Sequence, residues 1–467
     1  MEHAGLYCPQ AEQNLRPLYI EGYADQLSYQ AGEMVQLHVS TSAPVFALEV
    51  ARIGAQRQVV WRQEGLKGAA YDIPEEASAQ GCGWPAAHGF TVGDDWRSGY
   101  YEATLAVADG GGGFTHWSKR RAAGVLHFVV RSSRPGRDSK ILLQLATNTY
   151  NAYNNWGGYG LYAYHGRGKV QGHRVSFARP SVGMFDRWER DFVVWAEGQG
   201  YVLDYAVNSD LEFRPELLQH YRLVLSVGHD EYWSAPMRDH LEAFVASGGN
   251  AAFFSGNSVC WQVRSEDEGR ALVCWKQRFN QDPLYASGDH GLLSTLWSHH
   301  LVGRPENELT GVGFLYGGYH LSHGQFLDGS GAYTVHRPDH WVYEGTGLQQ
   351  GDEFGGANTI VGYECDGCEF VLKDGLPVAT GSFGTPENFV ILGTCPARWH
   401  PNDSEWYERW ERGHTGAATM GVYERGGTVF TAATTDWPHG LAGGDRTVAR
   451  ITHNVLDRLS GGGITSA

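Results

Sequence analysis

The chain has 467 residues, of which 42% are hydrophobic and 19% charged, a composition typical of a globular protein long enough to form two domains. Its formal net charge of −16 argues against a nucleic-acid or anionic-membrane partner, because phosphate binding requires a basic surface. No apolar run approaches the roughly 18 residues of a membrane span, and Met1–Gly5 lacks the features of a signal peptide, so we expect a cytoplasmic protein.

The N-terminal part of the chain shows the period-2 pattern of β-strands. After an irregular arm over residues 1–15, apolar and polar residues alternate in several short stretches separated by polar or glycine-rich loops. These stretches are Val35–Val39, Phe46–Val50, Tyr101–Val107 and Val125–Val129. The pattern predicts an all-β, immunoglobulin-like sandwich over residues 16–134.

Strand and helix patterns alternate from residue 138 onward. The central unit is the apolar run Val224–Gly228, followed by a helix that Ser234 caps and a second apolar strand, Ala251–Phe254. Such alternation predicts an α/β domain over residues 138–467, with a doubly wound, mostly parallel, amidotransferase-like sheet and helices on both faces. Residues 260–356 lack clear periodicity and are interpreted as a large insertion, after which strands return, the first at Thr359–Tyr363.

The residues at the predicted strand ends are the candidate functional residues, because ligands of doubly wound sheets bind outside the carboxyl ends of the strands. Those ends hold Thr147–Asn154, His229, Glu231, Tyr232, Asn257 and Glu364. Oxygen ligands favour hard cations, and a phenol loses its proton near neutral pH mainly on a strongly Lewis-acidic metal. Ferric iron (Fe3+) matches this set best, and zinc is the alternative, through His229, Glu231 and a further histidine.

The seven cysteines favour reduced thiols over a disulfide framework, because their number is odd and they are spread along the chain. Cys365 and Cys368 form the only close pair. Because no second pair stands at zinc-site spacing, the sequence does not favour a structural zinc site.

Several segments resemble the N,N-dimethylformamidase large (beta) subunit family. They occur in the same order over most of the chain, from about Gly22 to Leu459. The segments are Trp96–Tyr101 (WRSGYY), Thr149–Gly158 (TYNAYNNWGG), Val227–Trp233 (VGHDEYW), Phe254–Asn257 (FSGN) and Thr434–Trp437 (TTDW). The resemblance implies a mononuclear ferric site, held by two tyrosines and one glutamate, that hydrolyses a small amide.

Carried onto this sequence, the resemblance places the metal ligands at Tyr101, Tyr150 and Glu231, with Tyr100 as the alternative to its neighbour. Tyr101 lies in the sandwich, so the metal would sit at the domain junction. The positions that the family uses around the metal fall on His229, Asn257, Lys276 and Glu364. The family also implies a small partner subunit, although self-association of this chain is an alternative.

The mechanism that fits is attack of a metal-activated water on the carbonyl of a small linear, formamide-type, N-alkylated amide. Glu364 is the expected general base, His229 the donor to the oxyanion or leaving amine, and Asn257 the group that holds the carbonyl oxygen. A dry pocket for N-alkyl groups is expected from Trp156, Trp233 and Trp261.

Other interpretations remain open at this point. Each candidate has a structural role available to it: Tyr101 as a core tyrosine, for example, or Glu231 as the partner of an arginine. Cys260 suggests a metal-free, amidotransferase-like hydrolase, although Val259 and Trp261 are larger than the small residues that flank a nucleophile elbow. A non-catalytic carbohydrate-binding protein is the third possibility, suggested by the sandwich and the aromatic loops.

Overall fold

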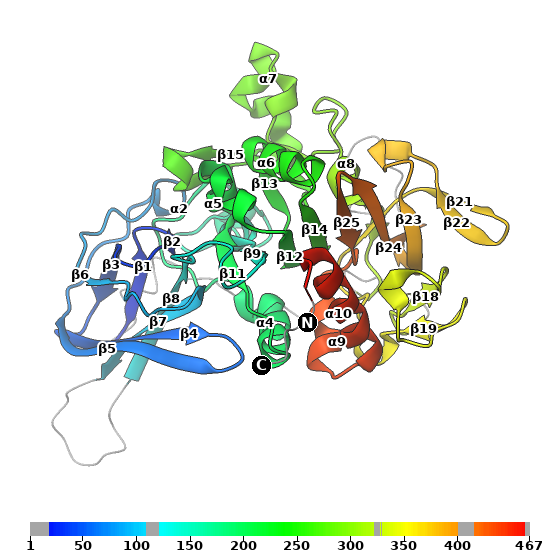
Figure 1. Ribbon diagram of the computed structural model, residues 1–467. Helices are drawn as coiled ribbons and strands as arrows, with labels where there is room; N and C mark the ends of the chain where they lie inside the picture. Colours follow the sequence, from blue (N-terminus) through cyan, green and yellow to red (C-terminus); the bar gives the residue numbers. More distant parts are fainter. Residues whose placement is uncertain (1–17, 109–120, 322–326, 328, 400–414, 463–467) are drawn as a thin grey trace.

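The computed structural model describes residues 18–108, 121–321, 327, 329–399 and 415–462 (Figure 1). The arm expected over residues 1–15 lies outside these ranges. None of the helices within them is long and apolar enough to cross a membrane.

Two sheets form the N-terminal part, drawn in blue and cyan in Figure 1. The first contains β1 (Ile20–Ala24), β3 (Met34–Thr41) and β6 (His88–Thr91). The second contains, in spatial order, β2 (Ser28–Tyr29), β8 (Arg121–Val130), β7 (Gly99–Ala108), β4 (Val45–Ile53) and β5 (Arg57–Lys67). The four alternating stretches lie within β3, β4, β7 and β8, and their inward-facing apolar residues share one core. The immunoglobulin-like class and the domain boundaries stay predictions.

A nine-stranded sheet forms the centre of the molecule. Its spatial order is β11 (Asp204–Val207), β9 (Ile141–Leu145), β12 (Leu223–His229), β14 (Asn250–Gly256), β25 (Gly427–Thr431), β24 (Thr415–Arg425), β23 (Val390–Arg398), β18 (Tyr333–Val335) and β19 (Glu353–Phe354). The strands from β11 to β25 run parallel, whereas each remaining pair is antiparallel. The sheet is therefore mixed, and the doubly wound, mostly parallel class stays a prediction.

The change of direction begins at a tight turn between β24 and β25. Arg425 pairs with Gly427, and Gly426 between them has a φ of 79°, a conformation that favours glycine. A Cβ at Gly426 would also lie 2.3 Å from the Ala246 carbonyl oxygen. A turn this short joins antiparallel neighbours only.

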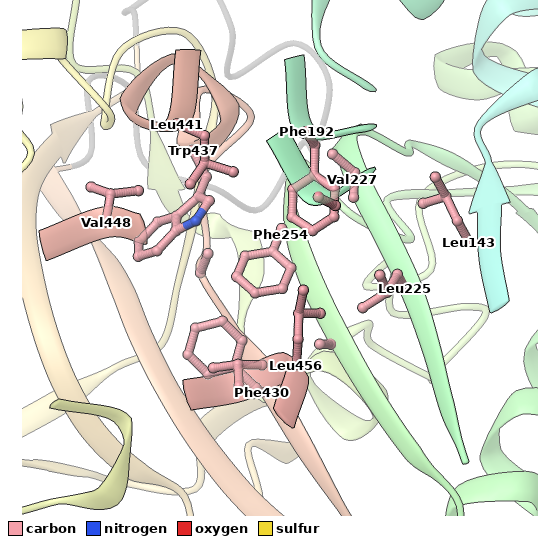
Figure 2. Close-up of a cluster of buried hydrophobic side chains, with 14 of the residues drawn as sticks. Leu143, Phe192, Leu225, Val227, Phe254, Phe430, Trp437, Leu441, Val448 and Leu456 are labelled. Atoms are coloured by element: carbon pink, nitrogen blue, oxygen red, sulfur yellow. The ribbon is translucent and has the colours of Figure 1, made fainter. Parts of the chain in front are cut away.

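Helices cover both faces of the sheet. On one face lie α4 (Glu189–Gly198), α9 (Trp437–Ala442) and α10 (Arg446–Ser460), whose apolar side chains pack against Leu225 and Val227 (Figure 2). On the other lie α5 (Asn208–Phe213), α6 (Ala235–Ala246) and α8 (Asn307–Thr310), which share a core with Val224. Alternate residues of β12 thus face opposite cores, which explains its continuous apolar run.

The predicted insertion contains short elements that its sequence pattern did not indicate. They are β15 (Trp261–Glu266), β16 (Ala271–Val273), α7 (Pro283–Ser287) and β17 (Gly313–Gly318), besides α8, β18 and β19. β15 and β16 join β10 (Arg174–Ser176) and β13 (Tyr232–Ser234) in a four-stranded sheet. Strands of two to six residues are too short to show a clear period.

One sequence prediction in the next segment is wrong. Thr359–Tyr363 forms no strand, because Thr359 adopts a left-handed conformation with a φ of 49° after a short 3-10 helix, Gly356–Asn358. The chain becomes extended only at β20 (Cys365–Gly367), and a hairpin of β21 (Phe370–Lys373) and β22 (Leu376–Ala379) follows. Among the described residues, α2 (Ala77–Gln80) and α3 (Thr147–Tyr153) are further short α-helices.

A buried ion pair joins the two parts of the molecule. Asp210 of α5 accepts a hydrogen bond from Ser28 Oγ at 2.7 Å and pairs with Arg131 Nη1 at 3.3 Å. Both Asp210 and Arg131 are buried. Arg131 also pairs with Glu33 at 3.4 Å, but the Glu33 side chain is largely exposed, so Asp210 is its buried counter-charge.

Asp210→Ala should lower the free energy of unfolding by about 3 kcal/mol, the lower end of the range for breaking a buried pair, because the buried guanidinium keeps only its largely exposed partner Glu33. Denaturant unfolding of the variant and the parent measures the difference. The matched control is Asp138→Ala, whose exposed pair with Arg134 should contribute about 0–1 kcal/mol. Equal losses in the two variants would contradict a structural role for the buried pair.

Glu306, next to α8, predicts a pH-dependent stability. Burial raises its pKa to about 8, and its Oε2 has no hydrogen-bond partner among the described residues. Because the folded-state pKa lies above the unfolded value of about 4.3, the contribution of the protonated carboxyl is complete at low pH and is lost as the pH rises toward 8.

Glu306→Gln should therefore gain stability relative to the parent as the pH rises from 5 to 8, by up to about 1.4 kcal/mol per pH unit. Unfolding at several pH values measures this trend. Glu75→Gln, at an exposed position, should follow the parent at every pH. A constant difference between Glu306→Gln and the parent would refute the burial argument.

Candidate functional site

The site begins where β12 ends. Gly228 has a φ of 77°, and a Cβ there would lie 2.4 Å from Trp188 Cβ, so only glycine fits this turn against the indole. The turn brings His229 and then Glu231 to the carboxyl edge of the sheet, and β13 begins directly after them. Both side chains are fully buried.

Neutral donors surround the Glu231 carboxylate. Tyr162 Oη lies 2.8 Å from Oε1 and 2.9 Å from Oε2. Trp261 Nε1 donates to Oε1 at 3.0 Å, and Asn257 Nδ2 donates to the same oxygen at 3.2 Å. Burial raises the pKa of Glu231, while the nearby His229 and Lys276 lower it.

A second carboxylate, Glu364, lies on the other side of the imidazole. His229 Nε2 is 3.0 Å from Glu364 Oε2 and 3.3 Å from Glu231 Oε2. Asn257 Nδ2 also donates to Glu364 Oε2, at 3.3 Å. Burial alone would lower the pKa of His229, but the two carboxylates outweigh it and raise the pKa to about 9. The imidazolium therefore links the two acids.

Lys276 supplies a second buried cation. Its Nζ donates to Tyr232 Oη at 2.7 Å and lies 3.4 Å from the centroid of the Tyr162 ring. The Trp261 ring centroid is 4.4 Å away. Burial lowers the pKa of Lys276 to about 8, partly offset by Glu231. The ammonium is thus enclosed by aromatic faces, a favourable setting for a desolvated cation.

Two phenols converge on these acids. Tyr153, at the end of α3, places its Oη 3.2 Å from His229 Nε2 and 2.9 Å from Tyr162 Oη. Burial raises the pKa of both phenols well above 10. Counting histidine, cysteine, aspartate and glutamate alone, the described residues contain no group of three or more arranged to hold a metal ion. Two phenols and one carboxylate nevertheless meet here, and such oxygen donors suit a hard cation.

Five of the seven predicted site residues come together. They are His229, Glu231, Asn257, Lys276 and Glu364. Glu364 reaches the cluster from an irregular segment before β20, not from the predicted strand end. Its Oε1 accepts from Tyr319 Oη at 3.4 Å, and sequence analysis did not single out this tyrosine.

The structure does not bring Tyr101 and Tyr150 to this cluster. Tyr101 belongs to the core of the N-terminal sheets, where it stacks on Trp96 and Phe128 and donates to the Arg97 carbonyl at 2.6 Å. Its neighbour Tyr100 stacks on Phe185.

Tyr150 donates to Glu189 Oε1 at 2.5 Å. Tyr153, three residues further along α3, and Tyr162 stand at Glu231 instead. The segment TYNAYNNWGG contains two tyrosines, and only the register of α3 distinguishes them.

Two of the three expected pocket tryptophans also lie elsewhere. Trp156 packs against Trp84, and Trp233 packs in the core beneath α6. Trp261 contacts Glu231 as described, and Trp188 stands 5.3 Å from the His229 ring. The wall of the site is therefore formed by indoles from two different segments, Trp188 before α4 and Trp261 at the start of β15.

The described cysteines do not support thiol catalysis. All six are buried and free of disulfides, and burial raises the pKa of Cys260 well above its ordinary value. A thiol in this environment is a poor nucleophile.

Comparisons with known proteins point to one family. A family model described as N,N-dimethylformamidase beta subunit-like, C-terminal, matches residues 47–452. The N,N-dimethylformamidase beta subunit of an Alcaligenes species is 25% identical over 85% of this chain and 58% of its own length. That of Paracoccus aminophilus is also 25% identical, over 81% and 54%. The chain thus spans little more than half the length of these relatives.

Among solved structures, a β-glucuronidase from Parabacteroides merdae matches 51% of this chain and 28% of its own at 9% identity, with a TM-score of 0.16, which carries no argument. The family match covers most of the chain and includes every residue of the cluster around His229. The resemblance expected from the sequence motifs is confirmed, and the chain belongs to the N,N-dimethylformamidase beta subunit-like family, matching its C-terminal part.

Proposed function

We propose that this protein is an iron-dependent hydrolase of the C–N bond of a small amide. The observation that carries the proposal is the convergence of two carboxylates and two phenols around His229, with Lys276 against the Tyr162 ring. Both curated relatives are named as N,N-dimethylformamidases, so N,N-dimethylformamide is the first substrate to test. Because they are named as beta subunits, a partner subunit is part of the proposal, with self-association as the alternative.

The residues present fit a ferric ion. Tyr153, Tyr162 and Glu231 would hold it, since their oxygens already meet within hydrogen-bond distance and phenolate with carboxylate is a donor set suited to a hard, strongly acidic cation. When bound, the ion would acidify a water and polarise the amide carbonyl. This set replaces Tyr101 and Tyr150, and the identity of the ion as iron, with zinc as the alternative, belongs to the proposal.

The remaining polar residues move protons and hold the two carboxylates in place. Glu364 accepts the proton of the attacking water, and His229, 3.0 Å away, passes a proton to the leaving nitrogen. Asn257 donates to both carboxylates and fixes their relative position. Lys276 offsets their negative charge from behind the Tyr162 ring. The aromatic wall keeps bulk water away from these charges and so strengthens their interactions.

Tyr162→Phe and Tyr153→Phe should each abolish or shift the visible phenolate-to-iron absorption band and reduce the bound iron by at least half. Tyr150→Phe is the matched control. The Tyr150 hydroxyl donates a hydrogen bond to Glu189, so its removal should leave the band unchanged. Metal analysis with the visible spectrum of the purified proteins measures both quantities. A band lost only in Tyr150→Phe would restore the ligand set expected from the resemblance, and a colourless zinc protein would refute iron.

Glu364→Gln should lower kcat for N,N-dimethylformamide by roughly 100- to 10,000-fold while the bound metal is retained, because a general base contributes a factor of this size. Glu369→Gln, an exposed carboxyl nearby in sequence, is the control and should keep the parent rate. Steady-state release of dimethylamine, with metal content measured on the same samples, provides the test. Unchanged kcat in Glu364→Gln would exclude this residue as the base.

A further inference from the structure

An arginine stands beside the site without an acidic partner. Arg187 ends a short 3-10 helix, Phe185–Arg187, and its side chain is exposed. Its guanidinium lies 4.2 Å from the centroid of the Trp188 ring and 4.9 Å from that of Tyr363. Within the described ranges, no hydrogen bond or ion pair engages this guanidinium. The nearby Asp186 pairs with Arg190 instead, at 3.2 Å.

One carboxylate, Asp436, binds both the Trp188 indole and the backbone of Tyr363. Asp436, in the segment TTDW, accepts from Trp188 Nε1 at 3.0 Å and from the Tyr363 backbone N–H at 2.8 Å. The same rings border His229, with centroid separations of 5.3 Å for Trp188 and 5.9 Å for Tyr363. The Arg187 guanidinium and the His229 ring therefore border the same two aromatic side chains.

A guanidinium on an aromatic face keeps the N–H donors at its edge available, and their fork matches a carboxylate. The protein carries a net charge of −16, so an arginine without an acidic partner provides a positive charge beside the site in a molecule that is negative as a whole. We propose that Arg187 binds a carboxylate on the substrate, which makes the preferred substrate an anionic amide with its carboxylate a few bonds from the scissile C–N bond. This inference rests on the proposed amide hydrolysis and narrows its substrate class.

The test compares N-formylglycine with its neutral analogue N-formylglycinamide. The parent protein should show a kcat/KM roughly 10- to 100-fold higher for the carboxylate, the range expected for one charge-assisted bidentate contact. Arg187→Gln should remove most of this preference, mainly through the KM of the anionic substrate. Arg190→Gln is the matched control, because that arginine is already paired with Asp186, and it should keep the parent's ratio.

No preference in the parent, or equal losses for both substrates in Arg187→Gln, would overturn the inference while leaving amide hydrolysis intact. Hydrolysis of neither compound, nor of N,N-dimethylformamide, would count against the proposed function. In that case calorimetric binding of the same two compounds decides the role of Arg187. Tighter binding of N-formylglycine that disappears in Arg187→Gln supports it, and equal binding of the two compounds refutes it.

Discussion

The rest of the site depends on one interaction, the contact of a buried imidazole with two buried carboxylates. Two carboxylates near one nitrogen, away from water, would repel each other strongly unless cations compensated them. His229 lies between them and Lys276 stands behind an aromatic ring, so the charges are balanced within the cluster. The turn at Gly228 permits this arrangement, because a larger residue would collide with Trp188.

The unusual aromatic content follows from the same constraint. A buried carboxylate needs hydrogen-bond donors, and phenols and indoles supply a donor together with apolar bulk. Tyr162 and Trp261 donate hydrogen bonds to Glu231, and Tyr319 donates one to Glu364. The 24 tyrosines and 16 tryptophans of the chain therefore include residues that solvate the acids in place of water. Additional charges would have required further compensation, whereas neutral donors do not.

The sequence pattern predicted the features that depend on neighbouring residues, namely the positions of strands and the residues at their ends. The apolar alternation located β3, β4, β7 and β8, and the ends of β12 and β14 located His229, Glu231 and Asn257. Non-local pairing was not predictable in this way, because the direction of β24 depends on a turn at Gly426 that packs against α6. The strand expected at Thr359–Tyr363 failed because a left-handed residue interrupts it. The choice between Tyr150 and Tyr153 depends on the register of a helix whose ends no clear capping signal marked.

That register separates the N-terminal sheets from the cluster. With Tyr153 and Tyr162 at Glu231, the described side chains of the cluster come from residues after 138, and Tyr101 belongs to the core of the N-terminal sheets. These sheets instead contact α4, where Arg52 pairs with Glu197, both nearly buried, at 2.5 Å. The chain just before α4 carries Arg187 and Trp188, which line the wall beside His229. The N-terminal sheets thus contact the helix that follows this wall, whereas the described side chains around His229 come from the later part of the chain.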